Sequence, residues 1–483
     1  MLGVISLILF FIILLGSIRK WIPQDVLPLQ SSLVLGALLL LGLALIFGQP
    51  FRPAQLLAST TLHPITATIA GFLLAGAVEA GGGFAAASRL LTRMGRGFLG
   101  LSGTVILLVN IPTIFAMPCG RVWAAALIPA AMMFGFELAR QRNDMSLVPV
   151  VVFGLIVNAA ASCGPSPLGG IGMMGEGTAG FRLHTFSNPQ QMAIMVITLL
   201  TMAAIAFDRR ITVNPRMIPK SEATPKDLPR TAYFTFGFYM IGLGVVFVTE
   251  PPVPIQTILL VMTILIMMVG KVSMKELISG VILHPVTAMV AGFIMAGALL
   301  ITGGFDTLIE CLSWLAIHTP LGYIGMSILL IYLPVIFPMP CGRIIAAALL
   351  PGVIMFGQHV AHMTGCPQCL PAMLVAFILC CAASCAPSPL GGIGGIGEGN
   401  LGLKSNVSSR SLQIGIMLGA PAAAMIVAYL GLSTAFFRLS EGIVALALGM
   451  VSGLVINLVL GYRIYKPGGI LGGLLVGALI MVL

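Results

Sequence analysis

The chain has 483 residues, of which 58% are hydrophobic and only 8% are charged. A soluble protein carries roughly 25% charged residues, so the composition excludes that class and predicts an all-α polytopic membrane protein. The net charge of +10 does not indicate nucleic-acid binding, because no basic stretch carries the stacking aromatic residues that such an interface needs. We expect the lipid bilayer to contact most of the surface.

Apolar runs at the start of the chain predict three ordinary spans, near 2–18, 30–48 and 61–78. Two further apolar stretches meet at Met117-Pro118-Cys119-Gly120-Arg121, where Pro-Cys-Gly permits a tight turn. These stretches form either two full spans or one re-entrant hairpin over 99–138.

The next apolar run begins at 146 and ends in Cys163–Gly177, a segment whose glycines and prolines cannot continue a helix. Non-helical backbone at membrane depth survives only where it is buried in protein or lines a polar cavity. We therefore predict a broken helix over 146–177, followed by a closing span over 190–207.

The chain contains an internal repeat at an offset of 222 residues. Ile111–Gly135 reads IPTIFAMPCGRVWAAALIPAAMMFG, and Leu333–Gly357 reads LPVIFPMPCGRIIAAALLPGVIMFG. Ala160–Gly177 matches Ala382–Gly399 at fifteen of eighteen positions, so the unit is duplicated. The predicted organisation is repeat 1 over 1–207, a cytoplasmic linker over 208–230, repeat 2 over 231–430 with its hairpin at 321–358 and its broken helix at 370–399, and two additional transmembrane helices within 431–483.

The basic residues decide between a hairpin and two full spans. A hairpin gives each repeat five crossings, an odd number, so repeat 2 lies upside down relative to repeat 1. With the N-terminus and the C-terminus outside, this topology places nineteen Lys and Arg residues on the cytoplasmic side and three outside. Such a positive-inside bias favours two inverted repeats.

Two inverted repeats, each with a hairpin that faces a broken helix, resemble the ion transporter superfamily, in particular its divalent-anion/sodium symporters and TRAP-transporter membrane subunits. The resemblance covers residues 1–430. Pro-Cys-Gly-Arg occupies the hairpin tips, where the sodium–carboxylate symporters carry Ser-Asn-Thr. The resemblance implies an elevator-type secondary transporter, with the hairpins and broken helices as the moving domain. The first three spans of each repeat would form a scaffold that makes a homodimer.

The broken helices are predicted ligand sites, because half-helix N-termini attract anions and freed carbonyls coordinate cations. The residues that we expect to bind substrate there are Ser166, Gly169, Gly170, Ser388, Gly391 and Gly392. An oxygen-rich, carboxylate-poor setting suits Na⁺, which we place near Ser162, Pro165, Gly172, Ser384, Pro387 and Gly394. A helix kink, with glycines for close packing, is the structural alternative.

Arg121 and Arg343 lie at the two hairpin tips. An intramembrane Arg costs roughly 2.5 kcal/mol or more, and its planar fork suits a carboxylate-like anion. We predict that both arginines bind substrate, together with the adjacent tip residues, which are Cys119, Gly120, Cys341 and Gly342. Two alternatives stay open: each Arg pairs with Glu176 or Glu398 of its own repeat, or each forms a solvent-exposed hairpin base.

Glu176 and Glu398 are also candidate proton carriers, since a desolvated carboxylate titrates near neutral pH. A cation/proton antiporter that uses them is therefore the alternative function, and a channel is a less favoured one. The chain has no HExxH, GxSxG or Walker A sequence, so we expect no enzyme and no cofactor. The predicted function is secondary active transport of a small organic anion across the cytoplasmic membrane, coupled to Na⁺ or H⁺.

A last motif falls in a loop that the predicted topology places outside. His359, His362, Cys366 and Cys369 form an H-x-x-H-x3-C-x-x-C pattern. This spacing permits a zinc site, a disulfide or free thiols.

Overall fold

The structure is a computed structural model, and its described residues form helices and no strand. These residues are 1–23, 25, 27–57, 62–95, 97, 99–115, 119–164, 170–179, 188–208, 210–213, 228–248, 254–279, 284–337, 341–387, 392–404, 406–430, 439–461 and 467–482.

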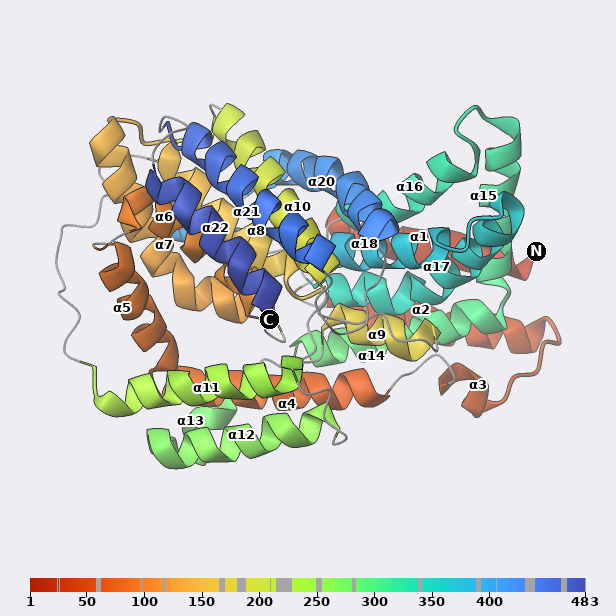
Figure 1. The fold of residues 1–483 in the computed structure, drawn as a ribbon. Helices are drawn as coiled ribbons and strands as arrows, with labels where there is room; N and C mark the ends of the chain where they lie inside the picture. The colour runs from red at the N-terminus through yellow and green to blue at the C-terminus, as the bar shows by residue number, and fades with distance from the viewer. Residues whose placement is uncertain are drawn as a thin grey trace.

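Repeat 1 contains ten helices among the described residues, and the first five include the three expected spans (Figure 1). They are α1 (Leu2–Ile18), α2 (Leu29–Ile46), α3 (Pro53–Leu57), α4 (Leu62–Ala80) and α5 (Gly83–Gly95). The second five cover the tip, the break and the closing span. They are α6 (Gly100–Ile114), α7 (Gly120–Arg142), α8 (Leu147–Ala161), α9 (Ile171–Ala179) and α10 (Asn188–Phe207).

Repeat 2 has the same succession of helices in its described residues. They are α11 (Arg230–Val248), α12 (Ile255–Gly270), α13 (Met274–Ser279), α14 (His284–Ile301), α15 (Gly304–His318), α16 (Gly322–Ile336), α17 (Gly342–Thr364), α18 (Cys369–Ala383), α19 (Ile393–Asn400) and α20 (Ser409–Leu430). Two further helices follow, α21 (Leu439–Val459) and α22 (Pro467–Val482).

Five described helices are long and apolar enough to cross a bilayer, and the bent pair α4–α5 makes a sixth candidate. The five spans are Leu29–Ile46, Gly120–Arg142, Gln190–Phe207, His284–Ile301 and Gly342–Thr364. Helices α6, α8, α16 and α18 have 15 residues each, about 22 Å of helix, which is less than the roughly 30 Å of a bilayer core. The prediction of an all-α polytopic membrane protein is confirmed.

The two repeats pack against each other reciprocally. Helix α4 of repeat 1 contacts α12 of repeat 2, and α14, the counterpart of α4, contacts α2, the counterpart of α12. In the same way α1 contacts α15, and α11, the counterpart of α1, contacts α5, the counterpart of α15. The contact of α9 with α17 likewise has its counterpart in the contact of α19 with α7. Figure 1 shows one of these layers, in which α4, α11 and α12 run side by side along one edge. Reciprocal pairing is what a two-fold rotation between the repeats produces. Whether that axis lies in the membrane plane, as an inverted repeat requires, stays a prediction.

The C-terminal helices break this symmetry. Helix α22 packs on α6, and α21 packs on α10, so the added pair covers repeat 1 (Figure 1). The α22–α6 contact is so close that a Cβ on Gly103 would overlap the carbonyl oxygen of Gly468. In repeat 2 the corresponding helix α16 presents Ile324, which is 73% exposed. Helix α6 is therefore buried by protein, and one face of α16 is left for lipid.

Helices α5 and α15 were not predicted from the sequence. Helix α5 turns by 67° from α4 and carries Arg93 on its exposed side and Leu91 on its buried side. Helix α15 buries Leu308 and Leu312 and exposes Trp314. Each follows a span directly, at a glycine pair, and charged residues interrupt the apolar run that would have revealed it.

Candidate functional site

The tip of each repeat contacts the break of the same repeat through a backbone–thiol hydrogen bond. The Gly120 amide, at the start of α7, donates to Cys163 Sγ at 2.6 Å, just beyond the end of α8. The Gly342 amide donates to Cys385 Sγ at 2.9 Å in the same way. The first amide of each tip helix is therefore satisfied by the protein itself.

Glycine is required at both tips by close packing. A Cβ on Gly120 would overlap the carbonyl oxygen of Ala159, and a Cβ on Gly342 would overlap that of Cys381. Neither glycine has a positive φ, so the requirement concerns space and not backbone strain. The predicted tip residues Gly120 and Gly342 thus join the tip to the last turns of α8 and α18.

Backbone hydrogen bonds join the described residues on the two sides of each break. The Ile171 amide donates to the Cys163 carbonyl at 2.9 Å, and the Ile393 amide donates to the Cys385 carbonyl at 3.0 Å. The Gly172 amide also donates, to the Gly164 carbonyl at 2.6 Å. Of the predicted substrate residues, Gly170 and Gly392 are buried beside these contacts. The predicted residues that fall outside the described residues are Pro165, Ser166, Gly169, Ser388 and Gly391.

Arg343 lies where the two repeats meet. It occupies the first turn of α17, is only 2% exposed and lies near four cysteines. The thiols belong to Cys341 and Cys385 of its own repeat and to Cys119 and Cys163 of the other. One buried guanidinium thus lies close to the tips and breaks of both repeats.

Arg121 has a different environment from its counterpart. It is exposed, and it lies near His284 at the start of α14. His284 Nδ1 lies 2.6 Å from Gln30 Nε2 on α2. The structure therefore places Arg121 beside the scaffold helices, whereas it places Arg343 in the interior.

The hydroxyl groups predicted to bind Na⁺ are buried at the ends of α8 and α18. Ser162 Oγ donates to the Ala159 carbonyl at 2.8 Å, and Ser384 Oγ donates to the Cys381 carbonyl at 2.7 Å. Each hydroxyl oxygen keeps lone pairs for a further ligand. Pro387 and Gly394, which follow Ser384 in the sequence, are also buried. A Cβ on Gly394 would overlap the Ala386 carbonyl oxygen.

Glu398 is held by the turn before α20. Its carboxylate accepts hydrogen bonds from the Asn406 amide at 2.6 Å and from the Ser408 amide at 2.8 Å, and the Ser408 hydroxyl donates to it at 2.5 Å. Glu398 is 4% exposed, so these bonds compensate a buried charge. The side chain of Glu176, its counterpart, lies outside the described residues, as does any pairing that involves it.

A polar group that the sequence analysis did not single out lies in repeat 1. Asn158 on α8 is fully buried, and its Oδ1 accepts hydrogen bonds from the Thr113 amide at 3.0 Å and the Thr113 hydroxyl at 2.8 Å. Its Nδ2 donates to Thr198 Oγ1 at 3.0 Å. An asparagine inside an otherwise apolar span is the sequence signal that could have revealed it.

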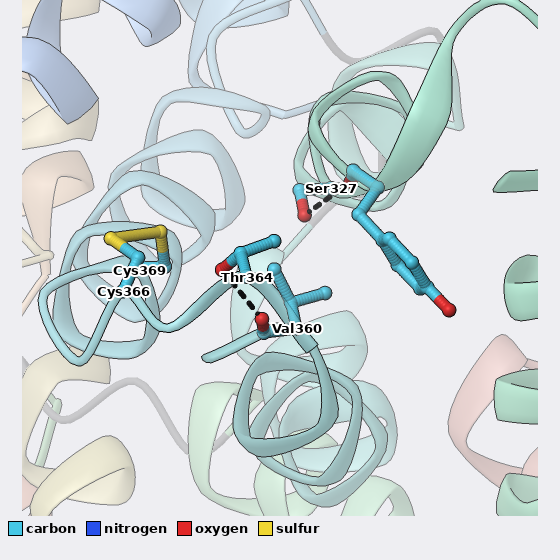
Figure 2. The surroundings of a disulfide bond; sticks show 6 residues. Ser327, Val360, Thr364, Cys366 and Cys369 are labelled. Carbon is cyan, nitrogen blue, oxygen red and sulfur yellow. Dashed lines mark hydrogen bonds between the residues drawn. A yellow bond between two sulfur atoms is a disulfide. The ribbon is translucent and has the colours of Figure 1, made fainter. Parts of the chain in front are cut away.

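Figure 2 shows how Cys366 and Cys369 form a disulfide at the end of α17, with Cα atoms 5.5 Å apart. Thr364, two residues earlier, donates its hydroxyl to the Val360 carbonyl at 2.7 Å. The disulfide uses both thiols of the H-x-x-H-x3-C-x-x-C pattern. Among the residues that the structure describes, no three His, Cys, Asp or Glu side chains are grouped so as to hold a metal ion.

Comparison with known proteins finds a likeness in fold. No family model matches the chain, and no curated protein matches it. The solved structure of the YdaH transporter from Alcanivorax borkumensis, described as having an unusual topology, aligns with a TM-score of 0.53 at 15% sequence identity. The alignment covers 84% of this chain and 99% of that one. The chain is therefore similar in fold, over most of its length, to a membrane transporter.

Proposed function

We propose that the protein is a secondary active transporter that moves a small, carboxylate-like organic anion across the cytoplasmic membrane, coupled to Na⁺ or H⁺. The observation that carries this proposal is Arg343, a 2%-exposed guanidinium at the start of α17 where tips and breaks of both repeats converge. A planar guanidinium recognises carboxylate in a bidentate manner, and the N-terminus of α17 adds positive partial charge.

The fold supports transport more than a static pore. The YdaH transporter has a similar fold, and discontinuous helices at a repeat interface are the usual transporter design. In an elevator-type mechanism the tip and break helices, α6–α9 and α16–α19, would move as one domain against the scaffold helices of both repeats. The reciprocal packing of α9 on α17 and of α19 on α7 ties the two halves of this domain together.

Glu398 supports the anion transporter over the cation/proton antiporter. Both of its carboxylate oxygens accept hydrogen bonds from Asn406 and Ser408, which favours a role in holding the turn before α20. A proton carrier needs access to both sides of the membrane in turn, and a carboxylate bound to three donors is a poor choice for that role.

Transport in proteoliposomes tests the proposal. A panel of mono- and dicarboxylates is offered to the purified, reconstituted protein under an imposed Na⁺ gradient, an imposed H⁺ gradient, or neither. We expect saturable uptake of at least one anion, driven above equilibrium by one of the two gradients. Flux that does not saturate and ignores both gradients would establish a channel instead, and anion-independent exchange of Na⁺ for H⁺ would establish an antiporter.

A further inference from the structure

Repeat 1 contains a buried network of amide and hydroxyl side chains that the anion site does not use. We call it the amide cluster, and its members are Asn110, Thr113, Asn158, Gln191 and Thr198. Every member is 1% exposed or less. Asn158 links Thr113 to Thr198, and Gln191 Nε2 donates to the Thr113 carbonyl at 3.3 Å. Polar side chains inside a membrane bundle are costly, so such a network points to a function.

Repeat 2 shows that the fold does not need this network. At the offset of 222 residues the corresponding positions hold Tyr332, Val335, Cys380, Gln413 and Ala420. Of these, Gln413 alone keeps the amide cluster's chemistry, and its Nε2 donates to the Val335 carbonyl at 3.2 Å, as Gln191 does to Thr113. The same helix arrangement is thus built once with the cluster and once without it.

The cluster leaves acceptor oxygens available. Gln191 Oε1 is fully buried and has no hydrogen-bond partner among the described residues. The orientation of the amide is fixed, because turning it over would set Oε1 against the Thr113 carbonyl oxygen. Asn110 Oδ1 accepts only one long hydrogen bond, from Asn158 Nδ2 at 3.4 Å, so it can also accept a ligand. A buried acceptor without a donor destabilises the protein unless a ligand binds it.

The surrounding charges favour a cation at these oxygens. Thr113 lies in the last turn of α6 and Asn158 in the last turn of α8, so two helix C-termini with negative partial charge meet at the cluster. Gln191 lies in the first turn of α10, and the positive partial charge of that helix N-terminus offsets the negative partial charge of one of the two C-termini. Helix α6 also contains Pro112, which has no amide to donate to the carbonyl one turn earlier.

We infer that the amide cluster of repeat 1 is a Na⁺ site, built from neutral amide, hydroxyl and carbonyl oxygens. It adjoins the break of repeat 1, since the Ser162 amide donates to the Asn158 carbonyl at 2.9 Å. If the protein is an anion transporter, as proposed above, this site supplies the coupling ion, and that part of the inference rests on the proposed function. The two ideas fail separately, because Na⁺ binding is measured without any anion and anion uptake is also measured under a proton gradient alone.

The test measures thermal unfolding of the full-length protein in detergent, titrated with NaCl against choline chloride at matched ionic strength. We expect a saturable rise in melting temperature with Na⁺ for the wild-type protein. Asn158→Cys and Thr198→Ala install the residues of repeat 2, and we expect each to weaken the apparent Na⁺ affinity roughly 10-fold or more. Because Ala420 and Cys380 occur naturally in the same fold, these variants are chosen to keep the protein folded.

Gln191→Met and Gln413→Met form the matched pair. The two glutamines make the same bond to a helix-end carbonyl, so both substitutions remove one hydrogen bond, but Gln191 alone belongs to the amide cluster. We expect the Na⁺ response to disappear in Gln191→Met and to stay within about twofold in Gln413→Met. A wild-type protein that does not respond to Na⁺, as expected if the cluster holds a structural water, overturns the inference. So does a response that survives in all three cluster variants.

Discussion

The two repeats carry the same Pro-Cys-Gly-Arg tip, and the structure uses the two copies differently. The backbone contacts agree: Gly120 and Gly342 each pack on a carbonyl and donate to a thiol just after the end of α8 or α18. The arginines do not agree, since Arg343 is 2% exposed whereas Arg121 is exposed. A duplicated motif therefore fixes the local backbone, and the other repeat decides the environment of its side chain.

The amide cluster also differs between the repeats, but here repeat 1 has the buried polar groups. Repeat 1 has Asn158 where repeat 2 has Cys380, so the buried polar network belongs to repeat 1 and the buried guanidinium to repeat 2. Helices α21 and α22 add to the difference, because they cover α6 and α10 beside the cluster. In this account repeat 2 supplies the charge that binds the anion, and repeat 1 supplies the oxygens that bind the cation.

The largest expected effect comes from removing one of the two tip charges. Arg343→Gln should reduce anion uptake by roughly 100-fold or more, since a charge-assisted bidentate contact is lost in a desolvated site. Arg121→Gln should leave uptake within a few-fold of wild type, because its guanidinium is exposed. Uptake into proteoliposomes, normalised to the amount of folded protein, measures both. Equal losses would show that the two tips share the substrate.

The two tips should depend equally on close packing, although their arginines differ in exposure. Gly120→Ala and Gly342→Ala should each lower stability by about 1–3 kcal/mol or more, because the new Cβ overlaps a helix carbonyl. Gly395→Ala, in α19, is the control: nothing lies within 4 Å of its Cβ, and the substitution should be neutral or slightly stabilising. Thermal unfolding of the three variants checks this, and a neutral Gly342→Ala would refute the close contact.

Substitution of Glu398 distinguishes a structural role of its carboxylate from a role as proton carrier. Glu398→Gln should lower stability by about 1–3 kcal/mol, since an amide cannot accept from all the donors that the carboxylate holds. Glu137→Gln, which removes an exposed carboxylate 4.0 Å from Arg140, should change stability very little. The pH dependence of anion uptake should be the same in Glu398→Gln as in the wild type. A flattened pH profile would favour the antiporter instead.

The smallest effect concerns the contact between the end of repeat 1 and repeat 2. Asp208 follows α10, accepts hydrogen bonds from Arg210 at 2.6 and 2.8 Å, and also accepts one from the Ser411 hydroxyl. The Arg210 guanidinium lowers the pKa of the Asp208 carboxyl well below its usual range. Arg210 is largely exposed, so Asp208→Asn should cost only about 1 kcal/mol or less.

The sign of the pH dependence follows from that lowered pKa. A carboxyl whose pKa is depressed by folding stabilises the protein above its unfolded pKa, near 4, and loses this contribution as the pH falls further. The stability difference between wild type and Asp208→Asn should therefore be constant at neutral pH and shrink below about pH 4. A difference that grows with acidity would contradict the assignment.

Much of the fold was accessible from the sequence because its signals are long or repeated. The spans at α1, α2, α4 and α10 are long apolar runs, and the breaks after α8 and α18 are glycine- and proline-rich segments that occur twice. The missed helices are short, and α5 and α15 are amphipathic, with charged side chains on one side. A search for apolar runs passes over such helices, although the spacing of Leu308 and Leu312 carries the helical period.

The site was harder to predict, because identical tip sequences gave no reason to treat Arg121 and Arg343 differently. Their environments depend on which residues of the other repeat pack against them, and this is a property of the tertiary fold. The glycines of the tips were predicted to bind substrate, which stays a prediction, and the structure adds a packing requirement that the sequence did not reveal, in close contacts with Ala159 and Cys381. A comparison of the repeats for differences, and not for matches, would have found Asn158.

One measurement tests the division of work between the repeats most directly. The dissociation constant of the best-binding carboxylate is determined by titration for wild type, Arg343→Lys and Arg121→Lys, which all keep a positive charge at each tip. Lysine loses the bidentate geometry, so Arg343→Lys should weaken binding by roughly 10- to 150-fold, whereas Arg121→Lys should stay within about threefold of wild type. A larger loss at Arg121, or equal losses at both, would contradict the assignment of the anion to the buried arginine of repeat 2.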